Sequence, residues 1–228
     1  MGNPIKKLAG QTAIYGLSSI LGRFLNYLLT PYWIKFGAFS TDQFGVITEM
    51  YAYVAFLVVF LTYGMETTYF RYSSKKDYDS RNIYSTILPT LIFSSFSFIL
   101  VSSFFSQGIA NWLMYPGHSE YVVWFAVIVG FDAITSIPLA YLRKENRAKK
   151  FAAVNLGNVA VNIGLNLFFI GYCKGNFETG NTNWLIDLVY NPNIGVGYVF
   201  IANLIASVFK LIMVFPELFL VRTGKFVK

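Results

Sequence analysis

The stretch GLSSILGRFLNYLLTPYW, residues 16–33, decides the fold class, because it is apolar enough to cross a membrane and yet carries Arg23 near its middle. The arginine has four polar neighbours in the same stretch: Ser18, Ser19, Asn26 and Thr30. A charged side chain at the centre of a bilayer costs about 2.5–3.5 kcal/mol on insertion scales. A membrane helix with such a charge needs a polar environment for it.

The composition of the whole chain excludes an ordinary soluble domain. Apolar residues make up 55% of the 228 residues and charged residues only 13%, whereas soluble domains average about 25% charged residues. Apolar stretches recur along the entire length, so the excess is not a single anchor. The sequence therefore predicts an all-α membrane protein that crosses the bilayer several times.

Six membrane spans are expected, each with roughly the 20 residues that the hydrocarbon core of a bilayer requires. Their approximate ranges are 10–36, 43–66, 83–106, 120–142, 150–172 and 196–221. The N-terminus resembles a signal peptide, but its apolar part continues past Tyr32 without a small-residue cleavage site, so it is expected to remain as the first span. Residues 1–228 are predicted to form a single unit.

The basic residues orient the predicted spans. The formal net charge is +7, but the lysines and arginines lie in short clusters between apolar spans, which is typical of topology signals and does not indicate nucleic-acid binding. With six alternating spans, 14 of the 18 basic residues fall on one side of the membrane. By the positive-inside rule, both termini are expected in the cytoplasm.

Polar residues of the first span lie on one side of the helix. At about 100° per residue, residues 11, 12, 15, 18, 19, 22, 23, 26 and 30 fall within a sector of roughly 140°. Leu17, Ile20, Leu21 and Phe24 lie on the opposite side. The span is therefore predicted to have a polar face that contains Arg23 and an apolar face that packs or contacts lipid.

Three other spans show the same arrangement. The stripes are Asn155, Asn158, Asn162 and Asn166 in the fifth span, Asn203, Ser207, Lys210 and Glu217 in the sixth, and Asp132, Ser136 and Arg143 in the fourth. Pro138 is expected to kink the fourth span. Three carboxylate or guanidinium groups at span ends, Glu66, Arg71 and Glu217, are expected to reach the headgroup region.

Stripes of this kind have two interpretations. Asn and Ser side chains can pack helices together through hydrogen bonds, or they can line a path. Charged residues inside a membrane usually face a bundle interior or a water-filled cavity, which favours the path, although a purely structural Arg23–Asp132 ion pair is an alternative. The predicted cavity residues are Arg23, Asn26, Asp132, Asn158, Asn162, Ser207 and Lys210.

Signatures of catalysis are missing from the sequence. It has no Walker A loop, no His-rich metal set and no Gly-x-Ser-x-Gly elbow, and the single histidine, His118, lies in a turn. We therefore expect no enzyme activity, no metal and no cofactor. A membrane-embedded enzyme that modifies lipid is the weaker alternative.

Several segments resemble oligosaccharide flippases, the polysaccharide-biosynthesis branch of the multidrug/oligosaccharidyl-lipid/polysaccharide exporter superfamily. Residues 6–33 resemble the first helix of these proteins, residues 44–75 the second helix and its cytoplasmic exit, residues 137–170 the turn from the fourth helix to the fifth, and residues 195–207 the start of the sixth. The strongest piece is YGMETTYFRY at residues 63–72.

The resemblance implies a fold and a function. Proteins of this family have two six-helix lobes, as in MATE-like transporters, and move an undecaprenyl-diphosphate-linked oligosaccharide across the bacterial inner membrane for O-antigen, capsule or exopolysaccharide synthesis. The chain resembles the N-terminal lobe alone, so a second six-helix lobe, from a missing C-terminal half or another protomer, is an expected partner beside membrane lipid and the lipid-linked glycan.

The resemblance also leaves alternatives open. An ion-coupled multidrug exporter lobe is the nearest one, but the two cations Arg23 and Lys210 suit a diphosphate better than a cationic drug. Asp132 is expected either to be the counter-ion of Arg23 or to couple transport to an ion.

Overall fold

The computed structural model describes residues 4–35, 39–75 and 78–220. The described residues are helical, with turns between the helices and no strand among them. The all-α fold class predicted from composition is therefore confirmed. The side chains of Arg23 and Asn26 lie outside the described part, although the backbone of both residues belongs to the first helix.

The first half of the chain alternates long helices with short ones. It contains α1 (Pro4–Tyr27), α2 (Leu29–Lys35), α3 (Thr41–Thr62), α4 (Met65–Ser73), α5 (Ser80–Phe104) and α6 (Ser106–Trp112). The second half contains α7 (Ser119–Lys144), α8 (Ala148–Asn166), the π-helix η1 (Leu167–Lys174), α9 (Gly175–Glu178), α10 (Trp184–Val189), the 3₁₀ turn η2 (Pro192–Ile194), α11 (Gly197–Met213) and α12 (Phe215–Leu218).

Four helical segments are long and apolar enough to cross a membrane: Thr41–Ser73, Ser80–Phe104, Ser119–Lys144 and Ala148–Glu178. They coincide with the expected spans at 43–66, 83–106, 120–142 and 150–172. The expected first and last spans contain the shorter apolar helices Thr12–Gly22 and Gly197–Met213. Six spans therefore remain a prediction, of which the structure supports four by length and composition.

Backbone chemistry explains where the expected long spans are broken. Pro31 has no N–H to donate to the carbonyl of Tyr27, so α1 ends there and α2 begins at Leu29. The break between α11 and α12 falls at Val214, and Pro216 follows in the first turn of α12, where it has no N–H to donate to the carbonyl of Ile212. Between α3 and α4 the chain passes through two left-handed residues, Tyr63 with φ 49° and Gly64 with φ 66°, which redirect it before Glu66. Pro138, in contrast, lies inside α7, which continues through it.

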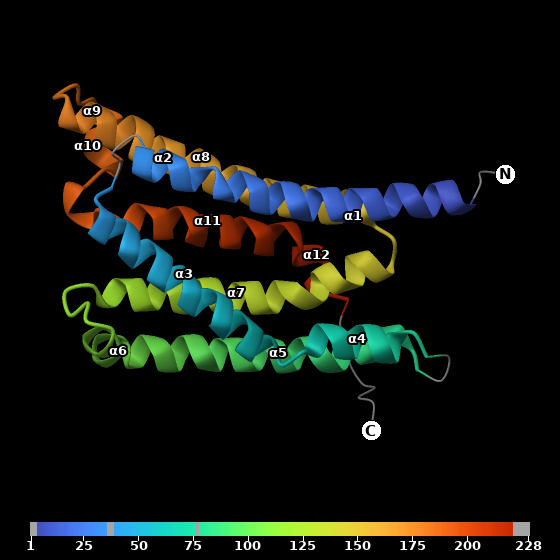
Figure 1. Cartoon of the computed structure of the whole chain (residues 1–228). Helices are drawn as coiled ribbons and strands as arrows, with labels where there is room; N and C mark the ends of the chain where they lie inside the picture. The colour runs from blue at the N-terminus through green and yellow to red at the C-terminus, as the bar shows by residue number, and fades with distance from the viewer. Residues whose placement is uncertain (1–3, 36–38, 76–77, 221–228) are drawn as a thin grey trace.

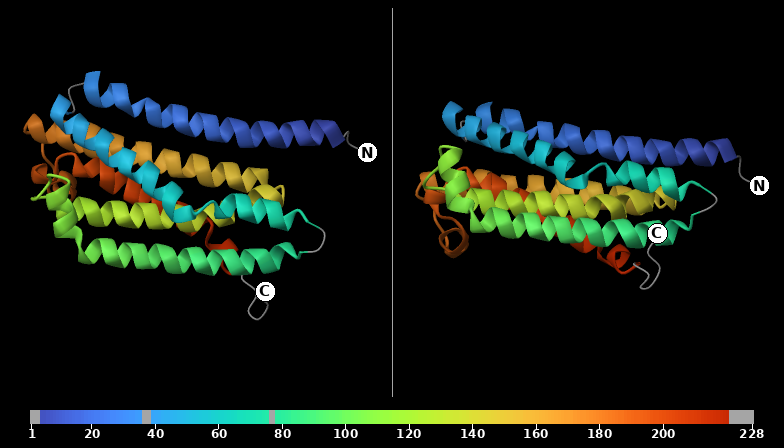
Figure 2. Two further views of the ribbon diagram at one scale, coloured as in Figure 1. Left: turned by 60° about the horizontal axis from the view of Figure 1, so that its bottom comes forward. Right: turned by 90° about the horizontal axis from the view of Figure 1, so that it is seen from below.

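The central helix of the bundle is α7. In its most apolar window 67% of the residues are buried, compared with 33% or fewer in the other three membrane-length segments. It packs against α5 on one side and α11 on the other, and α11 in turn packs on α8, which packs on α1. Helix α3 packs on α7 and crosses it diagonally in the view of Figure 1, and Figure 2 shows α3 inclined to the other long helices.

One end of the bundle collects basic segments of the chain. The beginning of α1, the end of α4, the beginning of α5 and the turn between α7 and α8 all lie at this end (Figure 1), which we call the basic end. Helices α2, α6, α9 and α10 lie at the opposite end, which we call the far end. The segment NWLIDLVYNP contains the short helix α10, with Ile186 buried and Trp184 and Leu188 exposed.

Candidate functional site

A polar cavity of about 390 Å³ opens between α1 and α8 on one side and α3, α4 and α7 on the other. It is lined by Ser18, Ser19, Gly22, Val58, Glu66, Asp132, Ser136, Leu139, Arg143, Phe151, Asn155, Asn158, Val159 and Lys210. Six helices contribute to this lining, although residues 18 and 210 stand almost at opposite ends of the sequence. The fold therefore gathers the polar faces of separate helices into one cavity.

Asp132 and Lys210 form an ion pair in this cavity. Lys210 Nζ donates to Oδ1 of Asp132 at 3.0 Å, and the two side chains are 16% and 26% exposed, respectively. Ser207 Oγ donates to the same oxygen at 3.5 Å. Ser207 and Lys210 are three residues apart on α11, so both face α7, where Asp132 lies. Each charge of the pair is thereby compensated by the other inside an otherwise apolar bundle.

The asparagine stripe of α8 divides into two parts. Asn155 and Asn158 line the cavity. Asn162 and Asn166 are buried, and Asn166 Nδ2 donates to the backbone oxygen of Asn162 at 2.9 Å and to its side-chain oxygen at 3.2 Å. Of the predicted site residues on this helix, Asn158 therefore faces the cavity and Asn162 lies in the packed interior.

The wall formed by α1 depends on small residues. Gly22 and Ser18 are buried against the neighbouring helices, and a Cβ at Gly22 would lie 3.3 Å from Cγ2 of Val159 on α8. Small residues at a crossing of membrane helices let the backbones approach closely. Arg23 and Asn26 follow Gly22 on the same helix, but their side chains lie outside the described part of the chain.

At its basic end the cavity contains a second ion pair, between Arg143 and Glu66. Arg143 Nη2 donates to Oε1 of Glu66. The left-handed break at Tyr63 and Gly64 turns the start of α4 toward α7, where Arg143 lies. Whether Glu66 also reaches the headgroup region stays a prediction. Arg143 is not among the predicted site residues, although its spacing from Asp132 on one face of the fourth span is the signal in the sequence that points to it.

The charges on the described lining cancel. Asp132 and Glu66 are acidic, Lys210 and Arg143 are basic, and each acid contacts one base. The predicted pairing of Asp132 with Arg23 stays a prediction, whereas its pairing with Lys210 is present. The cavity thus offers polar and charged contacts without a net charge from its described residues.

The expectation that Glu217 reaches the headgroups is wrong. Its side chain is only 2% exposed and accepts hydrogen bonds from Lys150 Nζ at 2.7 Å to each carboxylate oxygen. Arg147 lies 3.8 Å away, and Tyr84 donates to the backbone oxygen of Glu217 at 2.8 Å. The break at Val214, before Pro216, turns this residue inward, where it connects α12 to α5 and α8.

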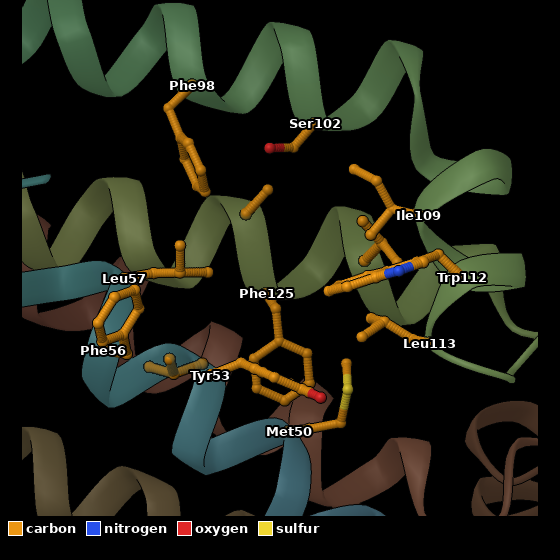
Figure 3. Close-up of a pocket in the computed structure, with 13 residues that line it drawn as sticks. Met50, Tyr53, Phe56, Leu57, Phe98, Ser102, Ile109, Trp112, Leu113 and Phe125 are labelled. Atoms are coloured by element: carbon orange, nitrogen blue, oxygen red, sulfur yellow. The ribbon is translucent and has the colours of Figure 1, made fainter. Parts of the chain in front are cut away.

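A second cavity, of about 420 Å³, has the opposite chemistry. It lies between α3, α5, α6 and α7 and is lined almost entirely by apolar side chains. Phe56, Leu57, Phe98, Trp112 and Phe125 surround it (Figure 3). Among the residues that the structure describes, no charged residue is part of this lining, so the polar cavity, and not this one, is the candidate site for a charged ligand.

Comparison with known proteins identifies the family of the chain. The family model described as "polysaccharide biosynthesis protein" matches residues 39–173, which is more than half of the chain. The matched range includes Glu66, Asp132, Arg143 and Asn158 of the polar cavity. No match was found among curated proteins or among solved structures. The apolar helices and this match together show that the chain is a membrane protein of the polysaccharide biosynthesis protein family, which has a role in polysaccharide synthesis or export.

Proposed function

We propose that the chain is one lobe of a flippase that moves an undecaprenyl-diphosphate-linked oligosaccharide across the bacterial inner membrane during synthesis of a surface polysaccharide. Membership of the polysaccharide biosynthesis family supports a glycan as the substrate. The polar cavity between apolar helices supports a path for the charged headgroup of its lipid carrier. The observation that carries the proposal is the Lys210–Asp132 pair, a cation and its counter-ion held within the apolar bundle.

We assign the diphosphate to Lys210, which lines the cavity, and Asp132 is the counter-ion that the diphosphate would replace there. Asn158 and Ser136 supply neutral hydrogen-bonding groups on the facing walls. Arg23 and Asn26 complete the proposed site from α1, and Ser207 orients Asp132. Asn162 contributes from the packed part of α8.

The orientation in the membrane follows from the basic end. Arg143, Lys144, Arg147, Lys149 and Lys150 lie around the α7–α8 turn, together with the start of α1. Positive charge is enriched on the cytoplasmic side of membrane proteins, so we assign the basic end and both termini to the cytoplasm. A second lobe supplies the opposing wall of the cavity, and the two lobes rock against each other to give alternating access.

A multidrug exporter lobe is the second candidate, and one observation favours it. The described lining contains two carboxylates, Asp132 and Glu66, so a cationic drug could bind by displacing Lys210 or Arg143. In that case Asp132 would bind the drug or the coupling ion. Binding measurements with an anionic carrier lipid and a lipophilic cation separate the two functions.

The experiment embeds the full chain in lipid nanodiscs and titrates it with labelled undecaprenyl diphosphate. Lys210→Gln should weaken binding about tenfold, equivalent to about 1.4 kcal/mol. The matched control is Lys149→Gln, which removes an exposed lysine outside the polar cavity and should leave binding unchanged. If both variants bind the carrier as the wild type does, or if only a lipophilic cation binds, the flippase assignment is wrong.

A further inference from the structure

Arg143 stands at the basic end of the polar cavity, in the last turn of α7, and its guanidinium lies near two aromatic rings. Its Cζ is 5.3 Å from the ring centroid of Phe70 on α4 and 5.5 Å from that of Phe151 on α8. Such contacts hold a guanidinium in place and weaken its hydration. Arg143 is thus positioned before any ligand arrives.

The guanidinium has donors to spare. It carries five N–H groups in a fixed fork. Within the described part of the chain, Nη2 donates to Glu66, and Nε is buried without a hydrogen-bond partner. Buried polar groups are nearly always satisfied, so this donor indicates a missing acceptor. Phosphate oxygens match the fork in a bidentate arrangement.

Glu66 is held less firmly than the arginine it contacts. It lies in the first turn of α4, directly after the left-handed pair Tyr63 and Gly64, and its side chain is 40% exposed. Ion pairs this exposed contribute little to stability. A ligand with two negative charges can therefore replace the carboxylate, which only has to rotate away from Arg143.

We propose that Arg143 is a binding point for phosphate at the mouth of the cavity, and that Glu66 is an internal counter-ion that occupies this point until a phosphate oxygen replaces it. The inference rests on the proposed function and adds to it the position at which the ligand binds first. Neither residue was part of the site predicted from sequence.

The two ion pairs of the cavity form separate binding positions for the ligand. Asp132 and Arg143 are 11 residues apart on α7, which places them about 16 Å apart along the helix axis. This separation of the two backbone positions favours two binding positions over one shared by both pairs. In this scheme the ligand binds Arg143 at the mouth first and then moves to Lys210 deeper in the bundle. It displaces a carboxylate at each position, first Glu66 and then Asp132.

The test measures the affinity of the full chain, in nanodiscs, for inorganic diphosphate by isothermal titration calorimetry. Glu66→Gln keeps the size of the side chain and removes the competing charge, so it should tighten binding about fivefold. Glu145→Gln is the matched control, since Glu145 is an exposed carboxylate at the same end and outside the cavity lining. Adding Arg143→Gln to the Glu66→Gln variant should abolish the gain in diphosphate affinity. Adding Arg71→Gln, which removes an exposed arginine of α4, should leave the gain unchanged.

The outcomes distinguish this inference from the function it rests on. A purely structural Glu66–Arg143 pair predicts that Glu66→Gln lowers the melting temperature and leaves diphosphate affinity unchanged or weaker, and that result overturns the inference. If Lys210→Gln still weakens binding in that case, the flippase assignment stands without a binding position at Arg143. If none of the cavity variants changes binding, both proposals are wrong.

Discussion

Lys210 and Asp132 join α11 to α7 across 3.0 Å, and Ser207, one turn before Lys210, contacts the same carboxylate oxygen. The three side chains form a polar link between two helices that also bury apolar residues, such as Val199, Phe200 and Ile128. A link of this kind fixes how α11 lies against α7, and its removal has consequences that can be measured.

Asp132→Asn should lower the stability of the chain by about 3 kcal/mol, because it leaves the ammonium group of Lys210 in the bundle without a counter-ion. Thermal unfolding in detergent reports the change. The double variant Asp132→Asn, Lys210→Gln should recover most of the loss, since no uncompensated charge remains. An Asp132→Asn variant that unfolds at the wild-type temperature would show that the pair is not structural, and a shifted pH or sodium dependence of transport would then identify a coupling role.

Glu217→Gln should also destabilise the chain by about 3 kcal/mol, because the carboxylate is buried and its loss leaves Lys150 without its partner. The matched control is Glu178→Gln. Glu178 is 64% exposed and contacts only the nearby Lys174, at 3.7 Å, among the ion pairs described, so this variant should change the melting temperature by less than about a degree. Equal effects of the two variants would contradict the burial of Glu217.

Gly22→Leu should push α1 away from α8, because even a Cβ at this position lies 3.3 Å from Val159. The expected result is a lower melting temperature and weaker binding of the carrier lipid, since α1 forms one wall of the cavity. Gly16→Leu provides the control on the same helix, where a Cβ has nothing within 4 Å. Both properties should be unchanged in the control.

The proposed orientation is tested by labelling single cysteines in intact cells. In a Cys173→Ala background, Ser74→Cys marks the basic end and Asn181→Cys the far end; both positions are exposed. A membrane-impermeant maleimide should label position 181 in intact cells and position 74 only after permeabilisation. The reverse pattern would place the termini outside the cytoplasm.

Helix faces could be predicted from the sequence because the period of a helix is a local property. Asp132, Ser136 and Arg143 share one face of α7 by spacing alone, and the structure has all three in one cavity lining. The length and apolar character of the four central spans could be predicted for the same reason.

The partners across helices could not be predicted, since they depend on which helices are neighbours. Periodicity put Arg23, Lys210 and Asp132 on polar faces without showing that α11 packs directly on α7. The inward turn of Glu217 depends on the break at Val214, and that of Glu66 on the left-handed residues before α4. When a stripe of polar residues is extended past a break in the helix, the residue beyond the break no longer lies on the same face.

The cancelled charge of the described cavity lining has an electrical consequence for the proposed flippase. Glu66, Asp132, Arg143 and Lys210 together add no net charge to offset that of a diphosphate, and protein groups, Arg23 included, stay behind when the ligand leaves, so the headgroup carries its own charge through the membrane voltage. Each elementary charge that crosses 100 mV changes free energy by about 2.3 kcal/mol. Because the cell interior is negative, the voltage pushes an anion outward. Export of the glycan would then be driven by the resting voltage of the cell, even without a co-transported ion.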